Sequence, residues 1–100
     1  MRESNFQKDL KKEIKKKFPG CYVMKTDPQQ YQGIPDLLIL YKDKWAALEV
    51  KKNAKEAEEA RQRPNQGLRV EQMNEMSFAS FIFPENKEEV VNDLERLFTS

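Results

Sequence analysis

The stretch of sequence that decides the fold is residues 33–52, which read GIPDLLILYKDKWAALEVKK. Two apolar, strand-compatible runs, 37–41 and 45–50, flank Lys42 and Asp43, and this pattern predicts an antiparallel β-hairpin with a tight turn. If Lys42 and Asp43 form a two-residue loop, Tyr41 pairs with Lys44. The two residue numbers of every cross-strand pair then sum to 85. This register places Asp36 opposite Glu49.

Asp36, Glu49 and Lys51 would then share one face of the hairpin. Opposed residues have Cβ atoms about 4.5–5.5 Å apart, and Glu49 and Lys51 would lie about 6.6 Å apart along one strand. Two facing carboxylates repel unless a cation lies between them, and Mg²⁺ prefers carboxylate oxygens. A structural alternative stays open, in which Asp36 is a turn residue after Pro35 and the other two form a solvated strand face.

The spacing of these residues resembles a nuclease signature. Gly-Ile-Pro-Asp at 33–36, followed by Glu-Val-Lys at 49–51, resembles the PD-(D/E)XK motif, and more narrowly the VRR-NUC family of small virus-type nucleases related to Holliday-junction resolvases. The resemblance covers nearly the whole chain, from a leading helix to a final strand and helix. It implies an α/β fold for a single domain, 1–100, with a restriction-endonuclease-like core, the order α-β-β-β-α-β-α and a mixed central sheet.

The resemblance also implies an activity and a metal site. A family member would be an endonuclease that hydrolyses DNA phosphodiester bonds with Mg²⁺ or Mn²⁺. Asp36, Glu49 and the carbonyl of Val50 would bind the metal, and Lys51 would position water and stabilise the pentavalent transition state. The substrate would be branched DNA, such as a Holliday junction, and small members of the family act as homodimers.

Two further residues enter the predicted site through the family pattern. The family's first helix carries a glutamate that approaches the metal, and Glu3 lies near the centre of this helix's apolar stripe. Glu13 is the alternative. The family also carries a glutamine on the helix after the Glu-X-Lys strand, and Gln66 resembles it. We therefore expect Glu3 and Gln66 to assist Asp36 and Glu49.

The composition limits the chemistry. The chain has 100 residues, no histidine and one cysteine, so histidine-dependent nucleases, Ser-His triads and an internal disulfide framework are excluded. No long apolar run is present, so we expect no membrane span, and we expect a cytoplasmic protein, in a bacterial host if a phage encodes it. No phosphate-binding loop motif occurs, which argues against a nucleotide cofactor.

Charge is distributed unevenly along the chain. The net charge is +1 overall, but residues 1–25 hold eight basic and three acidic side chains, whereas residues 71–100 hold two basic and seven acidic ones. The basic N-terminal part suits contact with phosphates. The opposite polarity of the two ends also permits self-association.

The remaining elements follow from hydrophobic periodicity and breakers. Phe6, Leu10, Ile14 and Phe18 recur every four residues and predict a helix over 4–18, with Ser4 and Gln7 as a capping box. We expect residues 52–63, whose apolar residues are all alanine, to be a mobile loop or frayed helix. The other expected elements are a strand at 21–25, a polar loop at 26–33, a helix at 64–76, an interior strand at 78–83 and a helix at 86–98.

Five residues near these elements are candidate nucleic-acid contacts. Tyr31 could stack on an exposed base, and cationic side chains could reach phosphates. The full set is Lys25, Tyr31, Gln32, Arg61 and Arg63. An ordinary solvated loop explains them as well. Two other functions also stay open: a nucleic-acid-binding protein on the same fold that does not cleave, and a nuclease acting on linear DNA or RNA.

Overall fold

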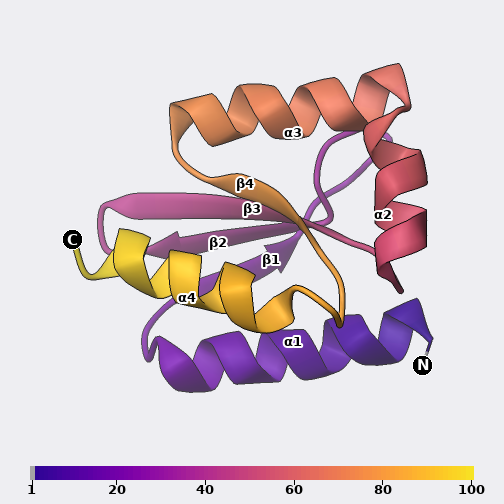
Figure 1. The fold of residues 1–100 in the computed structure, drawn as a ribbon. Helices are drawn as coiled ribbons and strands as arrows, with labels where there is room; N and C mark the ends of the chain where they lie inside the picture. Colours follow the sequence, from indigo (N-terminus) through magenta and orange to yellow (C-terminus); the bar gives the residue numbers. More distant parts are fainter. Residues whose placement is uncertain (1) are drawn as a thin grey trace.

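Four strands form one mixed sheet in the order β1-β2-β3-β4 (Figure 1) in the computed structural model, which describes residues 2–100. The strands are β1 (Tyr22–Lys25), β2 (Leu37–Tyr41), β3 (Lys44–Val50) and β4 (Ala79–Ile82). The first three pair antiparallel, and β4 runs parallel to β3. The α/β class and the mixed sheet predicted from the sequence are therefore confirmed.

Four helices cover the sheet in residues 2–100. They are α1 (Glu3–Lys17), α2 (Ala54–Arg61), α3 (Pro64–Met76) and α4 (Lys87–Phe98). Helices α1 and α4 lie on one face, α3 lies on the other, and α2 stands at the end of the sheet beside the start of α1 (Figure 1). The predicted element order is confirmed, with α2 as an addition between β3 and α3.

The predicted hairpin register is confirmed. Leu37 pairs with Leu48 and Tyr41 pairs with Lys44, so every pair sums to 85 as expected from a two-residue loop. Lys42 closes the turn with φ 58°, in the left-handed region. Because side chains alternate along a strand, this register sets which residues of the hairpin face α3.

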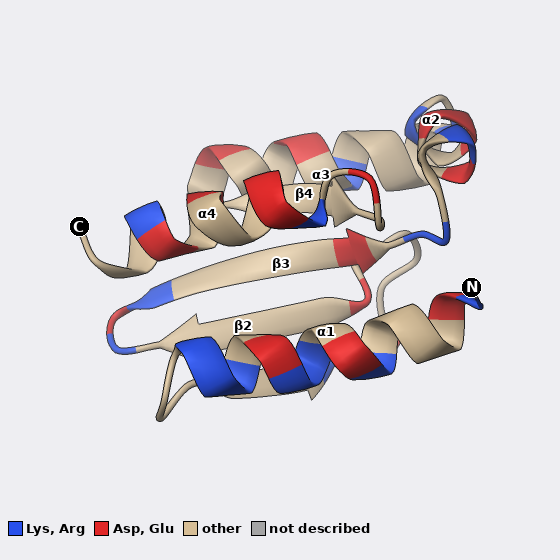
Figure 2. Cartoon of the chain, turned by 60° about the horizontal axis from the view of Figure 1, so that its bottom comes forward, with Lys and Arg blue, Asp and Glu red and all other residues tan. Residues whose placement is uncertain are grey.

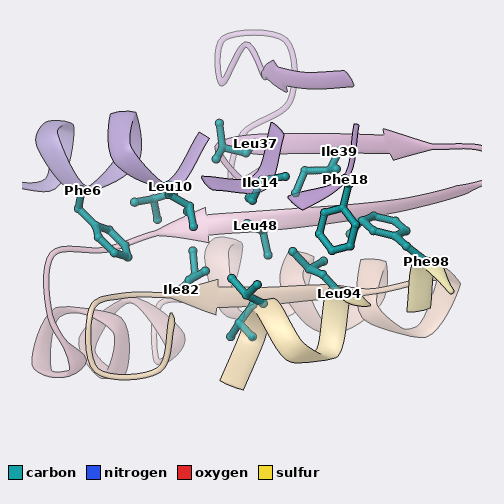
Figure 3. Close-up of a cluster of buried hydrophobic side chains, with 14 residues drawn as sticks. Phe6, Leu10, Ile14, Phe18, Leu37, Ile39, Leu48, Ile82, Leu94 and Phe98 are labelled. Atoms are coloured by element: carbon teal, nitrogen blue, oxygen red, sulfur yellow. The ribbon is translucent and has the colours of Figure 1, made fainter. Parts of the chain in front are cut away.

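The larger hydrophobic core lies between the sheet and helices α1 and α4. Figure 3 shows Leu10 and Ile14 of α1 directed toward Leu37 and Leu48 of the sheet, with Leu94 of α4 closing the other side. The predicted four-residue stripe of α1 is buried throughout, as is the apolar side of α4. Burial of these side chains stabilises the fold by roughly 1.5–3 kcal/mol each.

The unequal charge distribution is partly neutralised inside the fold. Helix α1 carries lysines along its length, with acidic residues between them (Figure 2), and it lies on the same side of the sheet as the acidic helix α4 (Figure 1). Lys17 Nζ is 3.2 Å from Glu95 Oε2, and Lys87 Nζ is 2.8 Å from Glu13 Oε1. The two ends of opposite polarity therefore meet within one chain, which weakens the charge argument for self-association.

Two sequence predictions about α1 and α2 are wrong. Helix α1 begins at Glu3, and its N-cap, Arg2, makes no side-chain cap, so Ser4 is inside the helix and no capping box forms. Residues 54–61 form a packed helix, whereas we expected residues 52–63 to be a mobile loop or a frayed helix. Ala57 and Ala60 are buried against the second core cluster, and Asn53 Oδ1 caps the helix by accepting from the Glu56 N–H.

The prediction that the last strand is interior is also wrong. β4 is buried on both faces but lies at the edge of the sheet. Two asparagine side chains accept hydrogen bonds from backbone N–H groups of this segment. Asn74 Oδ1 accepts from the Ala79 N–H, and Asn86 Oδ1 accepts from the Phe83 N–H. These contacts protect an edge that would otherwise be open to pairing with another strand.

Within residues 2–100, no helix combines the length and the apolar character needed to cross a bilayer.

Close packing of α2 on α3 can be tested at Gly67. A Cβ on Gly67 would lie 2.2 Å from the carbonyl oxygen of Arg61, which is backbone. Alanine is the better helix former by about 1 kcal/mol, yet we expect Gly67→Ala to lower the free energy of unfolding by about 1–3 kcal/mol in urea titrations, because the helices must separate. Gln72→Ala, at an exposed site of the same helix, should change stability by less than about 0.5 kcal/mol. Equal stability of both variants would contradict this packing.

Candidate active site

Asp36 and Glu49 meet where the β2–β3 ladder ends. Pro35 has no N–H, so the ladder cannot continue past it, and the Asp36 carboxylate takes the place of a backbone acceptor. Asp36 Oδ2 accepts from the Val50 N–H at 2.9 Å, and Glu49 Oε1 accepts from the Asp36 N–H at 3.1 Å. The predicted juxtaposition of Asp36 and Glu49 is therefore confirmed in the structure.

Lys51 completes a three-residue cluster. Its Nζ lies 3.2 Å from Glu49 Oε2, and the two residues are only 9% and 5% exposed. The backbone holds Lys51 in place, because its N–H donates to the Ile82 carbonyl of β4. In a strand, the N–H and C=O of one residue point the same way, so the Val50 carbonyl faces the Asp36 side.

The buried carboxylate of Glu49 has unusual electrostatics. Its pKa is raised to about 7, first by burial and then by the negative charge of Asp36, while Lys51 opposes both effects. Burial of a carboxylate is costly because the charged form loses its hydration. One ammonium group therefore does not fully compensate the two acidic side chains.

Glu3 faces this cluster, and Glu13 does not. The pKa of Glu3 is raised by burial first, then by a side-chain hydrogen bond with Glu56 and by the charge of Asp36. Glu13 instead pairs with Lys87, farther along α1. The effect of the Asp36 charge on Glu3 and the ion pair of Glu13 with Lys87 both favour Glu3 as the glutamate of the site.

Glu56 is a residue of this site that sequence reasoning missed. It lies in the first turn of α2, where its carboxyl group raises the pKa of Glu3 and its Oε2 atom lies 3.6 Å from Lys52 Nζ. The available signal was Asn53, a good N-cap three residues earlier. Figure 1 shows that the start of α2, which holds Glu56, lies near the start of α1.

Gln66 lies in the first turn of α3, at the end of the sheet where β3 stops. Its Oε1 atom is buried and has no hydrogen-bond partner among the described residues. The loop before Asp36 packs against this turn: Gly33 has φ 80°, and a Cβ there would lie 2.7 Å from the Asn65 carbonyl oxygen. A buried acceptor without a partner is unusual in folded proteins, and it is available to a donor from outside the chain.

The five predicted nucleic-acid contacts are exposed but scattered. Tyr31 and Gln32 lie on the loop before Asp36, and Arg69 of α3 donates to the Gln32 carbonyl at 3.2 Å. Arg61 stacks over Phe81 at 5.4 Å and lies 3.9 Å from Glu58. The others are Lys25, at the end of β1, and Arg63, the N-cap of α3.

The donor chemistry of the cluster suits a hard divalent cation. Carboxylate and carbonyl oxygens are the ligands that Mg²⁺ prefers, and Asp36, Glu49 and Val50 would supply them. A cation there would offset the charge that raises the pKa of Glu49. Among residues 2–100, however, no three acidic or cysteine side chains converge into a ligand set, so a backbone oxygen and water would have to complete it.

Comparisons with known proteins leave the family open. No protein-family model matches the chain, and a search of curated proteins found no match. The resemblance to VRR-NUC nucleases therefore stays a prediction.

The raised pKa of Glu49 predicts that the protein becomes less stable as pH rises, the opposite of what a carboxylate with a lowered pKa causes. Because the folded-state pKa of about 7 exceeds the reference value of 4.5, the folded state binds more protons between these values. Stability should then fall as pH rises through this window, by up to about 3 kcal/mol. We expect urea unfolding in EDTA to show this fall in the wild type and to show it much weakened in Glu49→Gln.

Glu59→Gln, on an exposed site of α2, is the matched control and should follow the wild type. Parallel stability curves for the wild type and Glu49→Gln across this window would mean that the carboxylate of Glu49 is not under electrostatic strain.

Proposed function

We propose that the protein is a Mg²⁺- or Mn²⁺-dependent endonuclease with a PD-(D/E)XK core of the VRR-NUC type, which hydrolyses DNA phosphodiester bonds. One observation carries the proposal. The hairpin register brings Asp36, Glu49 and Lys51 into contact at a buried strand end, and these are the residues of the Pro-Asp…Glu-X-Lys pattern. The mixed sheet with helices on both faces is compatible with such a core.

The roles of the residues follow from their contacts. Asp36 and Glu49 would hold the metal with the Val50 carbonyl, and Glu3 would add negative charge from α1. A divalent cation bound there would supply Lewis acidity and lower the pKa of a bound water. Lys51, held against Glu49, is placed to orient a water and to neutralise charge on the pentavalent phosphorus. Gln66 would donate or accept one hydrogen bond at the same end of the sheet.

The substrate and assembly are proposed from the resemblance. Branched DNA, cut by a symmetric homodimer, is the arrangement that the family would imply for a chain of this size. Exposed cations around the site end of the sheet, including Lys25 and Arg63, are suited to phosphate contacts.

A second function is favoured by a specific observation. Each carboxylate already accepts a backbone N–H, and Lys51 already pairs with Glu49, so the cluster can close the hairpin without a metal. Under this alternative, the protein binds nucleic acid on a nuclease-like fold and does not cleave it. A nuclease with another substrate, linear DNA or RNA, would share the chemistry of the main proposal.

Cleavage assays distinguish these functions. We expect a labelled four-way junction to be cut with Mg²⁺ or Mn²⁺ and to stay intact in EDTA. Lys51→Ala should lower the rate by about 10²–10⁴-fold, because it removes a charge and donor close to the reacting phosphate. Lys52→Ala removes the neighbouring exposed lysine and should change the rate only a few-fold.

Matched linear duplex, single-stranded DNA and RNA would run beside the junction to define the substrate. Failure of the wild type to cut any of them, with junction binding retained, would favour the non-cleaving alternative. Equal losses in the Lys51 and Lys52 variants would contradict the assigned role of Lys51.

A further inference from the structure

Thr26, the first residue after β1, makes two hydrogen bonds to the backbone that carries Asp36. Its N–H donates to the Asp36 carbonyl at 2.9 Å, which extends the β1–β2 pairing by one residue. Its hydroxyl donates to the Pro35 carbonyl at 2.6 Å and lies 3.3 Å from the Asp36 carbonyl oxygen. The two carbonyl groups that flank the Asp36 Cα are therefore both held from the β1 side.

The strand registers show which group the Pro35 carbonyl would bind in a regular sheet. Backbone groups of successive residues in a strand point to opposite neighbouring strands. Because the Lys51 N–H donates to β4, the Val50 N–H points toward β2. The β2–β3 register, in which the residue numbers of each pair sum to 85, pairs Pro35 with Val50. A regular antiparallel ladder would therefore have the Val50 N–H donate to the Pro35 carbonyl.

The protein replaces this ladder bond with a bond to a side chain. The Val50 N–H donates to Asp36 Oδ2 at 2.9 Å, and the Pro35 carbonyl is bonded to the Thr26 hydroxyl instead. The Pro35 carbonyl and the Asp36 carboxylate are thus alternative acceptors for one N–H group. The hydroxyl of Thr26 holds the first of them away from β3.

We propose that Thr26 is a positioning residue for Asp36. Its hydroxyl keeps the Pro35 carbonyl on the β1 side, which leaves the Val50 N–H to the Asp36 carboxylate and so fixes that carboxylate beside Glu49. This inference rests on the proposed nuclease function, in which Asp36 and Glu49 hold the metal. Thr26 itself acts only through the backbone of Asp36, as groups that orient metal ligands commonly do.

Fixing the carboxylate in advance favours metal binding. The bond from the Val50 N–H restricts rotation of the Asp36 side chain. A ligand group that is already ordered loses less conformational freedom when a cation binds, and the affinity rises accordingly. Metal affinity should therefore depend on the hydroxyl of Thr26.

Binding of Mn²⁺ measures this effect without substrate. Thr26→Val keeps the shape of the side chain but removes the hydroxyl donor, and we expect it to weaken Mn²⁺ binding about 10- to 100-fold in calorimetric titrations. Thr26→Ser keeps the donor and should bind Mn²⁺ with nearly the affinity of the wild type. Urea unfolding of both variants in EDTA establishes that each is folded under the conditions of the titration.

Thr99 offers a matched control. Its hydroxyl also donates to a backbone carbonyl, that of Glu95, at 2.7 Å. It follows the last residue of α4, and Figure 1 shows the C-terminus at the opposite end of the sheet from α2. Thr99→Val loses the same kind of hydrogen bond as Thr26→Val and should leave the Mn²⁺ affinity unchanged.

A second measurement needs no metal. Nuclear magnetic resonance detects scalar couplings across hydrogen bonds, between the donor nitrogen and the carbon of the acceptor group. In EDTA, the Val50 nitrogen should couple to the Asp36 Cγ in the wild type and in Thr26→Ser. In Thr26→Val we expect this coupling to be lost, with a coupling to the Pro35 carbonyl carbon in its place.

Wild-type Mn²⁺ affinity in Thr26→Val, or an equal loss of affinity in Thr26→Ser, would overturn the inference. An unchanged coupling between Val50 and Asp36 in Thr26→Val would also overturn it. If the wild type binds no Mn²⁺ but only Thr26→Val loses the coupling, the metal site of the proposed function is refuted, whereas the role of Thr26 in placing Asp36 stands.

Discussion

The register of the β2–β3 hairpin is the constraint on which the rest of the structure depends. A shift of one residue would move Asp36 and Glu49 to opposite faces, and it would also separate Leu37 from Leu48, so that one of these two core residues would be exposed. Two features hold the register: a two-residue turn with Lys42 in the left-handed region, and Pro35, which ends the ladder. The same pairing therefore builds the core and brings the two carboxylates together.

Burial of these carboxylates gives the site its character. Glu49 is buried near the end of β3. Its raised pKa reflects the loss of hydration and the nearby charge of Asp36. Lys51 offsets part of this charge. On the α1 side, Glu3 and Glu56 approach each other and add to the acidic end of the sheet. A bound cation would stabilise a site with this surplus of carboxylates, and the stability of the fold would then depend on the proposed metal.

The sequence predicted the parts of the fold that repeat locally. The four-residue stripe of α1, the hairpin and its register, and the cluster of Asp36, Glu49 and Lys51 could all be read from periodicity and loop length. Helix α2 could not, because Ala57 and Ala60 are too small to give a strong apolar pattern, and the buried surface of Phe81 against which they pack comes from a distant strand.

Other features depend on contacts between residues far apart in the sequence, which hydrophobic periodicity does not reveal. The edge position of β4 was missed because burial by helices on both faces gives the same apolar run as an interior strand. Glu56 was missed for the same reason as α2.

Binding of Mn²⁺ would test directly whether Asp36 and Glu49 form a metal site. Electron paramagnetic resonance of free Mn²⁺, titrated with the protein, counts saturable sites without any substrate. We expect at least one site per chain, lost or severely weakened in Asp36→Asn and Glu49→Gln and retained in the α2 variant Glu58→Gln. An absence of saturable binding, or equal binding by Glu49→Gln and the wild type, would contradict a metal site at the end of the hairpin.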